Sequence, residues 1–344
     1  MTRSEPRCCI ISVLWVTQLE LSEPKIYATL RFTFTPAASQ VGSFSLTFAV
    51  SDGKGGTASE TILITVLAGL SINIASPGNG TTVPSGLVVV RGSVDAAGTD
   101  VGVSVNGFTA TVNAGQWVVQ LSLKPGMQNL TATASTIAGR QATHTVAVNV
   151  SAASGGGVFL SASIQSGVAP LTVSWLLSNQ TMRNLVAFEF DENGRGMFGQ
   201  ATSSFDGVQT TYATAGLYLA VLRATDEQGV TYTATAVVNV EDPLVVRTRF
   251  QGVWTSLKDR LLAGDIEGAL NHLAPAIRPR FETVFRQLGA DLPTIAAGFG
   301  DIEVLEQLDD IAETLIVQQE NNSPMLYFIY YRRDILGRWL IEEM

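Results

Sequence analysis

Apolar and polar residues alternate with a period of two along most of residues 28–242. Between residues 43 and 66 this alternation predicts a strand, a turn at the glycine-rich Asp52–Gly56 and a returning strand. Further along, the alternating valines of Val101–Val105 lead into Asn106-Gly107. That pair favours a type I′ hairpin turn, because both central residues of such a turn need a positive φ. Short strands at this spacing are typical of β-sandwiches.

The period changes to that of a helix at about residue 247. Apolar residues spaced by three and four predict three helices between residues 247 and 289, the second of them capped by Asp265 and ended by Pro275. After Gly300 the period of two returns. It predicts four strands, over residues 302–308, 311–319, 325–333 and 338–343. Helices followed by a curved antiparallel sheet indicate an α+β domain.

Composition supports a boundary at the same place. The 344 residues are 46% hydrophobic and 15% charged, with a net charge of −9, so a disordered chain and a nucleic-acid-binding surface are both excluded. Residues 1–242 carry 26 charged side chains. Residues 243–344 carry 25, although this segment is less than half as long. The chain therefore contains a charge-poor β region and a C-terminal domain of ordinary charge density.

These patterns predict a mainly β fold, with tandem immunoglobulin-like β-sandwiches followed by a C-terminal α+β domain of helices and a curved antiparallel sheet. The expected parts are a non-native or unstructured segment 1–27, a partial module 28–68, a sandwich 70–150, a second sandwich 157–242 and the α+β domain 245–344. The module 28–68 is partial because its three strands cannot close a sandwich of about seven. We expect the chain to be part of a longer polypeptide.

The two sandwiches resemble known modules. Residues 157–242 resemble a polycystic kidney disease (PKD) repeat, on the motifs Gly167–Val173, Phe188–Asp191, Tyr212–Tyr218 and Asp226–Gly229. Residues 70–150 resemble the bacterial immunoglobulin-like domain that accompanies catalytic domains in glucodextranase-type enzymes, on Ser76–Gly80, Val105–Gly107, Leu123–Gly126 and Ala132–Gly139. Both resemblances imply spacer or binding modules of bacterial surface proteins.

The two ends of the chain carry resemblances of their own. Residues 28–68 resemble half of a putative-Ig or cadherin-like bacterial repeat, on Thr35-Pro36, Gln40–Gly42 and Asp52–Thr57. Residues 245–344 resemble the nuclear transport factor 2-like (cystatin-like) fold, on Leu261–Leu270 and Asp334–Ile341. The latter resemblance implies a cone with an apolar pocket, which some members use for catalysis and many use only for binding.

No catalytic motif is present, so we name no catalytic residue. The candidates for lining the cone pocket are His272, Trp254 and Tyr327, although a histidine next to Leu270 and Leu273 is more often structural. Trp117, Trp175, Trp254 and Trp339 lie on apolar-alternating faces, so core packing is expected for all four rather than stacking on sugars.

The candidate metal ligands are Asp191 and Asn193, which resemble part of an oxygen-ligand calcium loop. Thr202 stands where a complete loop of that kind needs a glutamate, and a backbone turn explains the same residues. No cofactor is called for, and weak calcium binding is the one alternative left open.

The chain carries no export signal that we recognise. Arg3, Arg7 and the apolar Cys8–Val16 imitate a signal peptide, but Glu5 interrupts the basic region and no small-residue cleavage site follows. No apolar run is long enough to span a bilayer. We still expect a bacterial extracellular or cell-surface location, because the resembling modules occur there.

The expected function is that of a non-enzymatic modular surface protein, whose partner is a protein or a polysaccharide at the cell surface. One alternative is the accessory C-terminal region of a secreted polysaccharide-degrading enzyme. Another is a small-molecule binder or enzyme that uses the C-terminal cone. A polar pocket holding His272 or Tyr327 would support the cone alternative, whereas an interior filled by Trp254, Phe281 and Phe285 would contradict it.

Overall fold

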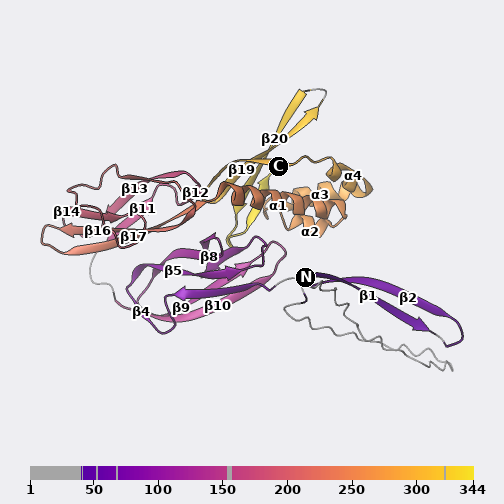
Figure 1. The fold of residues 1–344 in the computed structure, drawn as a ribbon, viewed down its shortest axis with the longest axis horizontal. Helices are drawn as coiled ribbons and strands as arrows, with labels where there is room; N and C mark the ends of the chain where they lie inside the picture. The colour runs from indigo at the N-terminus through magenta and orange to yellow at the C-terminus, as the bar shows by residue number, and fades with distance from the viewer. Residues whose placement is uncertain (1–39, 41, 52, 67–68, 153–156, 321–322) are drawn as a thin grey trace, which may run out of the picture. The chain divides into compact units, whose positions relative to one another are not determined.

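A computed structural model describes residues 40, 42–51, 53–66, 69–152, 157–320 and 323–344 (Figure 1). The chain divides into two compact units, Met1–Gly69 and Leu70–Met344. The described part of the first unit is one antiparallel hairpin, of β1 (Gly42–Ser51) and β2 (Thr57–Val66). This confirms the strand, turn and strand that the alternation predicts. The segment 1–27 lies outside the described residues. So does the part of the module 28–68 that precedes β1, except residue 40.

An immunoglobulin-like β-sandwich opens the second unit. Its strands are β3 (Ser71–Ser76), β4 (Thr82–Val83), β5 (Gly86–Asp95), β6 (Gly102–Val105), β7 (Phe108–Asn113), β8 (Gln116–Leu123), β9 (Gly126–Ser135) and β10 (Gln141–Val150). Trp117, at 1% exposure, lies in its core and donates its indole N–H to the Ser93 carbonyl at 3.1 Å. Asn106 and Gly107 have φ values of 49° and 85°, so the predicted type I′ geometry is confirmed.

A second sandwich follows. One layer holds β11 (Val158–Ala162), β13 (Leu171–Asn179) and β15 (Gln209–Tyr212), and the other holds β12 (Ser166–Val168), β14 (Leu185–Asp191), β16 (Gly216–Asp226) and β17 (Thr231–Glu241). Between the layers Trp175 packs edge-on against Phe190, at 5.1 Å between ring centroids. The Trp175 indole N–H donates to Thr210 Oγ1 at 2.8 Å, so the buried ring leaves no polar atom unpaired.

The C-terminal domain has the predicted α+β order. Its helices are α1 (Pro243–Leu262), α2 (Ile266–Leu270), α3 (Arg278–Leu288), a 3₁₀ turn η1 (Gly289–Asp291) and α4 (Leu292–Ala297). Its strands are β18 (Ile302–Leu308), β19 (Ile311–Glu320), β20 (Ser323–Arg333) and β21 (Trp339–Glu343). Asp265 caps α2 as predicted, because its carboxylate accepts the Gly268 N–H at 2.9 Å. Helix α4 is not among the three helices that the sequence predicts.

One sheet runs through the second sandwich and the C-terminal domain, in the order β14-β16-β17-β12-β18-β19-β20-β21. The short strand β12 joins the two halves: it lies parallel to β17, with Ser166 opposite Asn239, and antiparallel to β18, with Gly167 opposite Leu308. Asp309, in the turn after β18, accepts the backbone N–H groups of Gln165 and Ser166 at 2.7 and 2.9 Å. The sheet therefore crosses the boundary that the sequence places at residues 242–245.

Candidate functional site: a groove along helix α1

The first sandwich is held against the rest of its unit by side-chain hydrogen bonds. Asn113 donates to Asn239 Oδ1 at 2.7 Å and to the Val240 carbonyl at 3.0 Å. Asn239 is fully buried, and its own amide N–H donates to Ser166 Oγ at 3.0 Å. Gln120 adds a bond to the Thr235 carbonyl at 2.6 Å. A single amide, that of Asn239, thus connects β7, β12 and β17.

The backbones of the first sandwich and the C-terminal domain also approach closely. A Cβ atom on Gly102 would lie 2.3 Å from the Gly337 carbonyl carbon, and one on Gly337 would lie 2.7 Å from the Val103 nitrogen. Both glycines are therefore required by the contact between the two chain segments.

An ionic cluster occupies the same junction. Arg249 of α1 lies 2.6 Å from Glu241 Oε2, at the end of β17, and 3.3 Å from Asp100 Oδ1, in the first sandwich. The side chain of Glu241 is 3% exposed and that of Arg249 is 13% exposed. Burial raises the pKa of Asp100, an effect that the Arg249 guanidinium opposes. A buried carboxylate is costly without its partner. Arg249 therefore stabilises the contact between α1, the first sandwich and the end of β17.

Beside this cluster lies a cavity of about 1100 Å³, which we call the α1 groove. One wall is formed by α1 and α2, and the other by three loops of the first sandwich. Its lining residues are Val94–Ala96, Gly98–Val101, Val112, Gly115, Ile137, Ala138, Leu244, Val245, Thr248, Arg249, Gly252, Val253, Ser256, Arg260, Asp265, Gly268, Asn271 and His272. Large cavities between domains that combine apolar walls with a few polar groups are common ligand sites.

His272 lies at the α2 end of the groove. Its Nε2 is 2.8 Å from Ser256 Oγ and its Nδ1 is 3.0 Å from the Gly268 carbonyl. Burial lowers the pKa of His272, so the ring is neutral near pH 7. Of the three pocket candidates, it is the one that the structure places in a cavity, but that cavity lies outside the expected cone.

Trp254 and Tyr327 lie elsewhere. Trp254 is buried on the core side of α1, where its indole N–H donates to the Gly300 carbonyl at 2.9 Å. Tyr327 is 43% exposed on β20. The three candidates are therefore not brought together in one site.

Aromatic rings fill the interior of the C-terminal domain. Phe250 packs against Tyr331 and Trp339, with ring centroids 4.8 and 5.1 Å apart. Trp254 and Phe285 belong to the same core, and Phe281 packs against it. This filling counts against the cone-pocket alternative. Trp117, Trp175 and Trp339, the other three tryptophans for which core packing is expected, are also buried, as the alternation predicts.

Asp191 and Asn193 form a backbone turn. The Asp191 carboxylate accepts N–H groups from Asn193 at 3.2 Å and from Gly196 at 2.6 Å. Burial raises the pKa of Asp191, but these bonds outweigh it and the net pKa is lowered. Among the described residues, no group of three or more His, Cys, Asp or Glu side chains is arranged to hold a metal ion.

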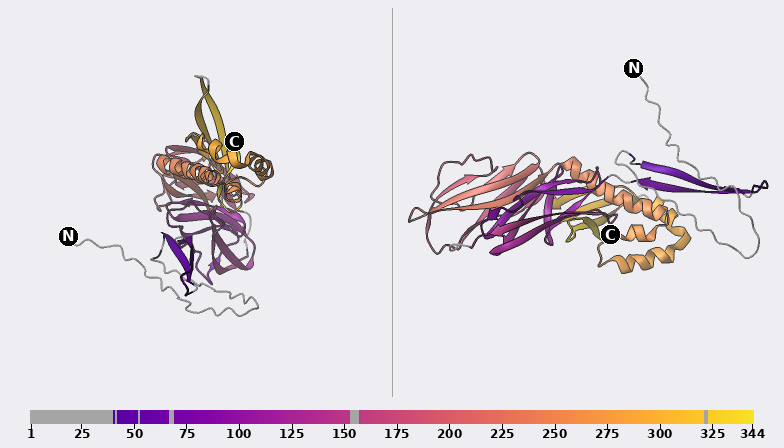
Figure 2. Two further views of the ribbon diagram at one scale, coloured as in Figure 1. Left: turned by 90° about the vertical axis from the view of Figure 1, so that its right-hand side faces the viewer. Right: turned by 90° about the horizontal axis from the view of Figure 1, so that it is seen from below.

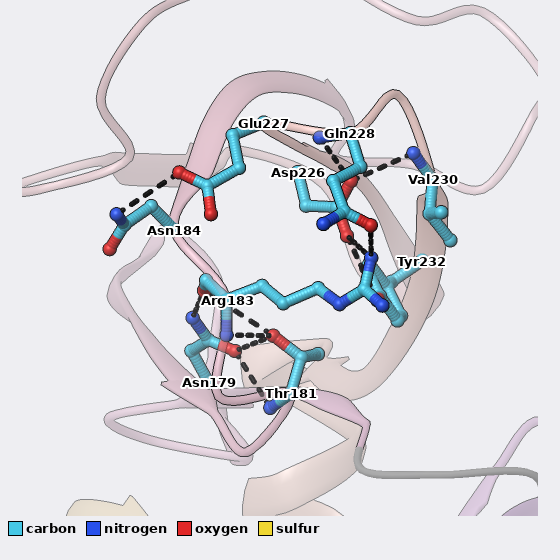
Figure 3. A network of polar contacts seen from close by, with 9 residues as sticks. All are labelled: Asn179, Thr181, Arg183, Asn184, Asp226, Glu227, Gln228, Val230 and Tyr232. Atoms are coloured by element: carbon cyan, nitrogen blue, oxygen red, sulfur yellow. Dashed lines mark hydrogen bonds and ion pairs between the residues drawn. The ribbon is translucent and has the colours of Figure 1, made fainter.

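A second polar network surrounds Asp226 at the end of β16 (Figure 3). Its carboxylate accepts the N–H groups of Gln228 and Val230, both at 2.9 Å, and the Tyr232 hydroxyl at 3.1 Å. Figure 3 shows the Arg183 guanidinium directed at Asp226 and Gln228, and the Asp226 contact measures 3.3 Å. The network fixes the β16–β17 turn.

No local pattern in the sequence indicates that Asp100, Glu241 and Arg249 meet at the junction between the first sandwich and the C-terminal domain. They are 149 positions apart at the extremes, and each stands alone in a locally ordinary pattern. The one available signal is that Arg249 directly precedes Phe250 on the apolar side of α1.

The first unit has a family match. A model described as a bacterial Ig domain matches residues 10–65. The match begins upstream of residue 28, inside the segment 1–27 for which we expect no native fold. No curated protein matches the chain. No helix in the described part of the chain is long and apolar enough to cross a bilayer.

Several solved structures are similar to parts of the chain. The fibronectin(III)-like modules of Clostridium thermocellum CbhA are 16% identical, with 51% of this chain and 96% of theirs covered and a TM-score of 0.21. A modular endo-β-1,4-mannanase from Cellulomonas fimi is 28% identical, with coverage of 30% and 22% and a TM-score of 0.19. SGBP-B of a Bacteroides ovatus mixed-linkage glucan utilization locus is 17% identical, with coverage of 49% and 47% and a TM-score of 0.19. The matched region spans less than half of the last two chains.

Proposed function

We propose that this protein is a non-enzymatic, modular bacterial surface or secreted protein that binds a partner in the α1 groove. In this proposal residues 157–242 are a PKD-like module, residues 70–150 a glucodextranase-type immunoglobulin-like module, and residues 245–344 a nuclear transport factor 2-like domain. The two modules present the C-terminal domain, and the first of them, residues 70–150, supplies one wall of the binding site.

The observation that carries the proposal is the groove itself. At its α1 end, Leu244 and Val245 are 69% and 54% exposed, although both are large apolar residues at a domain junction. The junction beside them is fixed by hydrogen bonds and by the Arg249 cluster. A fixed junction with exposed apolar walls is pre-organised, so a partner gains contacts without the cost of closing the domains.

The lining chemistry supports a protein segment as the partner. Among the described residues that line the groove, none carries a phenyl, phenol or indole ring on which a sugar ring stacks. The lining combines apolar side chains, such as Leu244 and Val245, with charged and amide side chains, among them Arg260, Asp265 and Asn271. An extended peptide with apolar and polar side chains matches this mixture.

His272 has a structural role in this proposal. Its ring nitrogens lie within hydrogen-bond distance of Ser256 and of the Gly268 carbonyl, and its pKa is lowered by burial. The imidazole thereby joins α1 to the end of α2 and holds that end of the groove in place. The alternative of an accessory region in a polysaccharide-degrading enzyme stays a prediction.

Gly252 gives a direct test of the groove. It lines the groove in the middle of α1, and a Cβ atom there meets open space, so the backbone accepts a side chain at this position and Gly252→Trp places an indole in the groove. Labelled full-length protein is measured for binding to fixed bacterial cells, to extracted cell-surface polysaccharide and to a peptide array. We expect at least a tenfold loss on one of these surfaces.

The control is Thr255→Trp, which adds the same ring at an exposed position of α1 outside the groove lining. It should bind like the unmodified protein. Equal binding by both variants would remove the groove from the proposal, and loss on polysaccharide alone would identify a sugar as the partner.

A further inference from the structure

Ser256 and His272 form a hydrogen-bonded pair at the wall of the α1 groove. Ser256 lies on α1 and His272 follows α2, and both residues line the groove. The Ser256 Oγ and His272 Nε2 atoms are 2.8 Å apart. Helices α1 and α2 are in contact, and Figures 1 and 2 show the helices of this domain, drawn in orange, gathered together. A hydroxyl and an imidazole from different segments thus meet at a cavity large enough for a ligand.

The protein fixes which ring nitrogen of His272 carries the proton. Nδ1 is 3.0 Å from the Gly268 carbonyl oxygen, which only accepts hydrogen bonds. Nδ1 of the neutral ring is therefore the donor, and Nε2 is left as the acceptor for the Ser256 hydroxyl proton. The backbone of His272 is fixed as well, because its N–H donates to the Ala269 carbonyl at 3.0 Å and its carbonyl accepts the Ile341 N–H at 2.9 Å.

This arrangement activates a serine hydroxyl as a nucleophile. An unprotonated imidazole nitrogen takes the hydroxyl proton as the oxygen attacks. Burial lowers the pKa of His272, so the ring is in its base form near pH 7. Charged groups from both helices act on the ring: Arg260 of α1 opposes its protonation, and Asp265, the N-cap of α2, favours it.

A positive charge lies one helical turn from the serine. Arg260 is four positions after Ser256 on α1, so both residues share one face of the helix, and both line the groove. The Arg260 side chain is 51% exposed and makes an ion pair with Asp265 at 2.8 Å. A cation at such a position stabilises the negative oxygen that develops when a hydroxyl attacks a carbonyl group. The groove therefore combines a nucleophile, a base and a cation.

We propose that Ser256 is a reactive serine that takes up an acyl group from a carboxylic ester bound in the α1 groove. Its Oγ bonds to the carbonyl carbon and the ester C–O bond breaks. The Oγ proton passes to His272 Nε2 and from there to the departing alcohol oxygen, so the products are an O-acyl serine and a free alcohol. Binding in the groove is the premise taken from the proposed function, and the new bond adds a covalent attachment without turnover.

The probe for this reaction is p-nitrophenyl acetate, added to the full chain and quenched in acid. Peptide mass spectrometry measures the rate of acetylation at Ser256, with the exposed Ser178 as an internal reference. Ser256 should react at least tenfold faster than Ser178. His272→Gln should slow the reaction at Ser256 by about a hundredfold or more, because the base is lost.

Thr255→Ala is the matched control, since Thr255 is exposed next to Ser256 and lies outside the groove lining. It should leave the rate at Ser256 unchanged. The melting temperature of each variant shows that folding is retained. In the unmodified chain the rate should stay level between about pH 7 and pH 8, because His272 is already unprotonated, whereas a serine that reacts through hydroxide speeds up about tenfold.

Acetylation of Ser256 at the rate of Ser178, an unchanged rate in His272→Gln or a tenfold rise from pH 7 to pH 8 would each overturn the reactive serine. Each of these results would do so even where Gly252→Trp abolishes binding to a partner. Acetylation of Ser256 with the expected dependence on His272 supports the reactive serine. Without binding to cells, polysaccharide or peptides, that same result would count against the proposed function alone.

Discussion

At the scale of single residues, the stability of the junction depends on a few polar side chains that connect distant segments. Asn239 bonds to Asn113 and Ser166, and Arg249 bonds to Glu241 and Asp100. Removing one member of a buried pair leaves the other without its partner, which costs more than the pair contributes.

Arg249→Met should lower the free energy of unfolding by about 3 kcal/mol, because the buried Glu241 carboxylate loses its counter-charge. Arg247→Met, at an exposed position of the same helix, should change it by less than about 0.5 kcal/mol. The measurement is urea denaturation of the two variants. Adding Glu241→Gln to Arg249→Met should restore part of the lost free energy of unfolding. A double variant less stable than Arg249→Met alone would contradict the stabilising role of the Arg249–Glu241 pair.

The pH dependence of stability should carry the signature of His272. Burial lowers its folded-state pKa below the ordinary value of 6.5, so the unfolded chain binds a proton that the folded chain does not. The contribution is complete above about pH 6.5 and is lost as the pH falls toward the folded-state pKa, by roughly 1.4 kcal/mol for each unit of lowering.

His272→Gln keeps an amide within reach of Ser256 and removes the titration. Its free energy of unfolding should therefore fall less than that of the unmodified chain between about pH 7 and pH 5. Urea denaturation at the two pH values measures the difference. Equal slopes for both proteins would show that His272 titrates normally.

At the scale of elements, the sequence predicts strands and helices well where one face is buried. The alternation at Ile302–Leu308 and the 3.6-residue spacing of Phe250, Val253, Trp254, Leu257 and Leu261 each match an observed element, and all five of those α1 residues are buried. Helix α4 is missed because its six residues are too few to show a period. Val284 of α3 is 38% exposed, whereas Phe285 of the same helix is buried and Phe281 and Leu288 pack partly buried against the core.

Contacts between distant segments cannot be predicted from the local sequence pattern. Nothing local in Ser166–Val168 distinguishes β12 from a loop, because its neighbours β17 and β18 come from residues about 70 and 140 positions later. The exposure of Met325–Phe328 also cannot be predicted from the sequence, because apolar residues on both faces of a strand usually indicate complete burial. Periodicity reports the type of element and leaves its partners undetermined.

The turn between β18 and β19 should be sensitive to Asp309. Its φ is 50°, and its carboxylate accepts two N–H groups from β12 and the residue before it. Asp309→Ala loses both bonds and strains the backbone, so we expect unfolding to become easier by about 2 kcal/mol. Asp309→Asn keeps an oxygen acceptor and tolerates the positive φ, so its loss should stay below about 1 kcal/mol.

Chemical denaturation compares these variants, with Asp301→Ala as the control. The Asp301 carboxylate is 96% exposed and lies 3.8 Å from Lys258 Nζ. Such a pair contributes little. A loss in Asp301→Ala as large as that in Asp309→Ala would contradict the special role of Asp309.

At the scale of the whole molecule, residues 70–344 form one compact unit, although the sequence divides them into three domains. The continuous sheet, the Asn239 amide and the Arg249 cluster each cross a domain boundary. Cooperativity is therefore expected to extend across all three domains.

A chain of residues 70–344 should unfold in a single calorimetric transition, with equal calorimetric and van't Hoff enthalpies. Residues 70–242 alone should melt at least several degrees lower, because β12 loses its pairing with β18 and Glu241 loses Arg249. Two resolved transitions in 70–344, or an unchanged melting temperature after truncation, would show that the domains are independent.

The shared sheet has a consequence for how such a gene can be rearranged. Tandem modules are commonly duplicated, lost or exchanged by recombination at the linkers between them, and a self-contained module survives the transfer. A crossover near residue 242 would separate β12 from β18 and split one sheet between two genes. The three C-terminal domains of this chain are therefore expected to be inherited together, and the boundary at residue 69 is where exchange is tolerated.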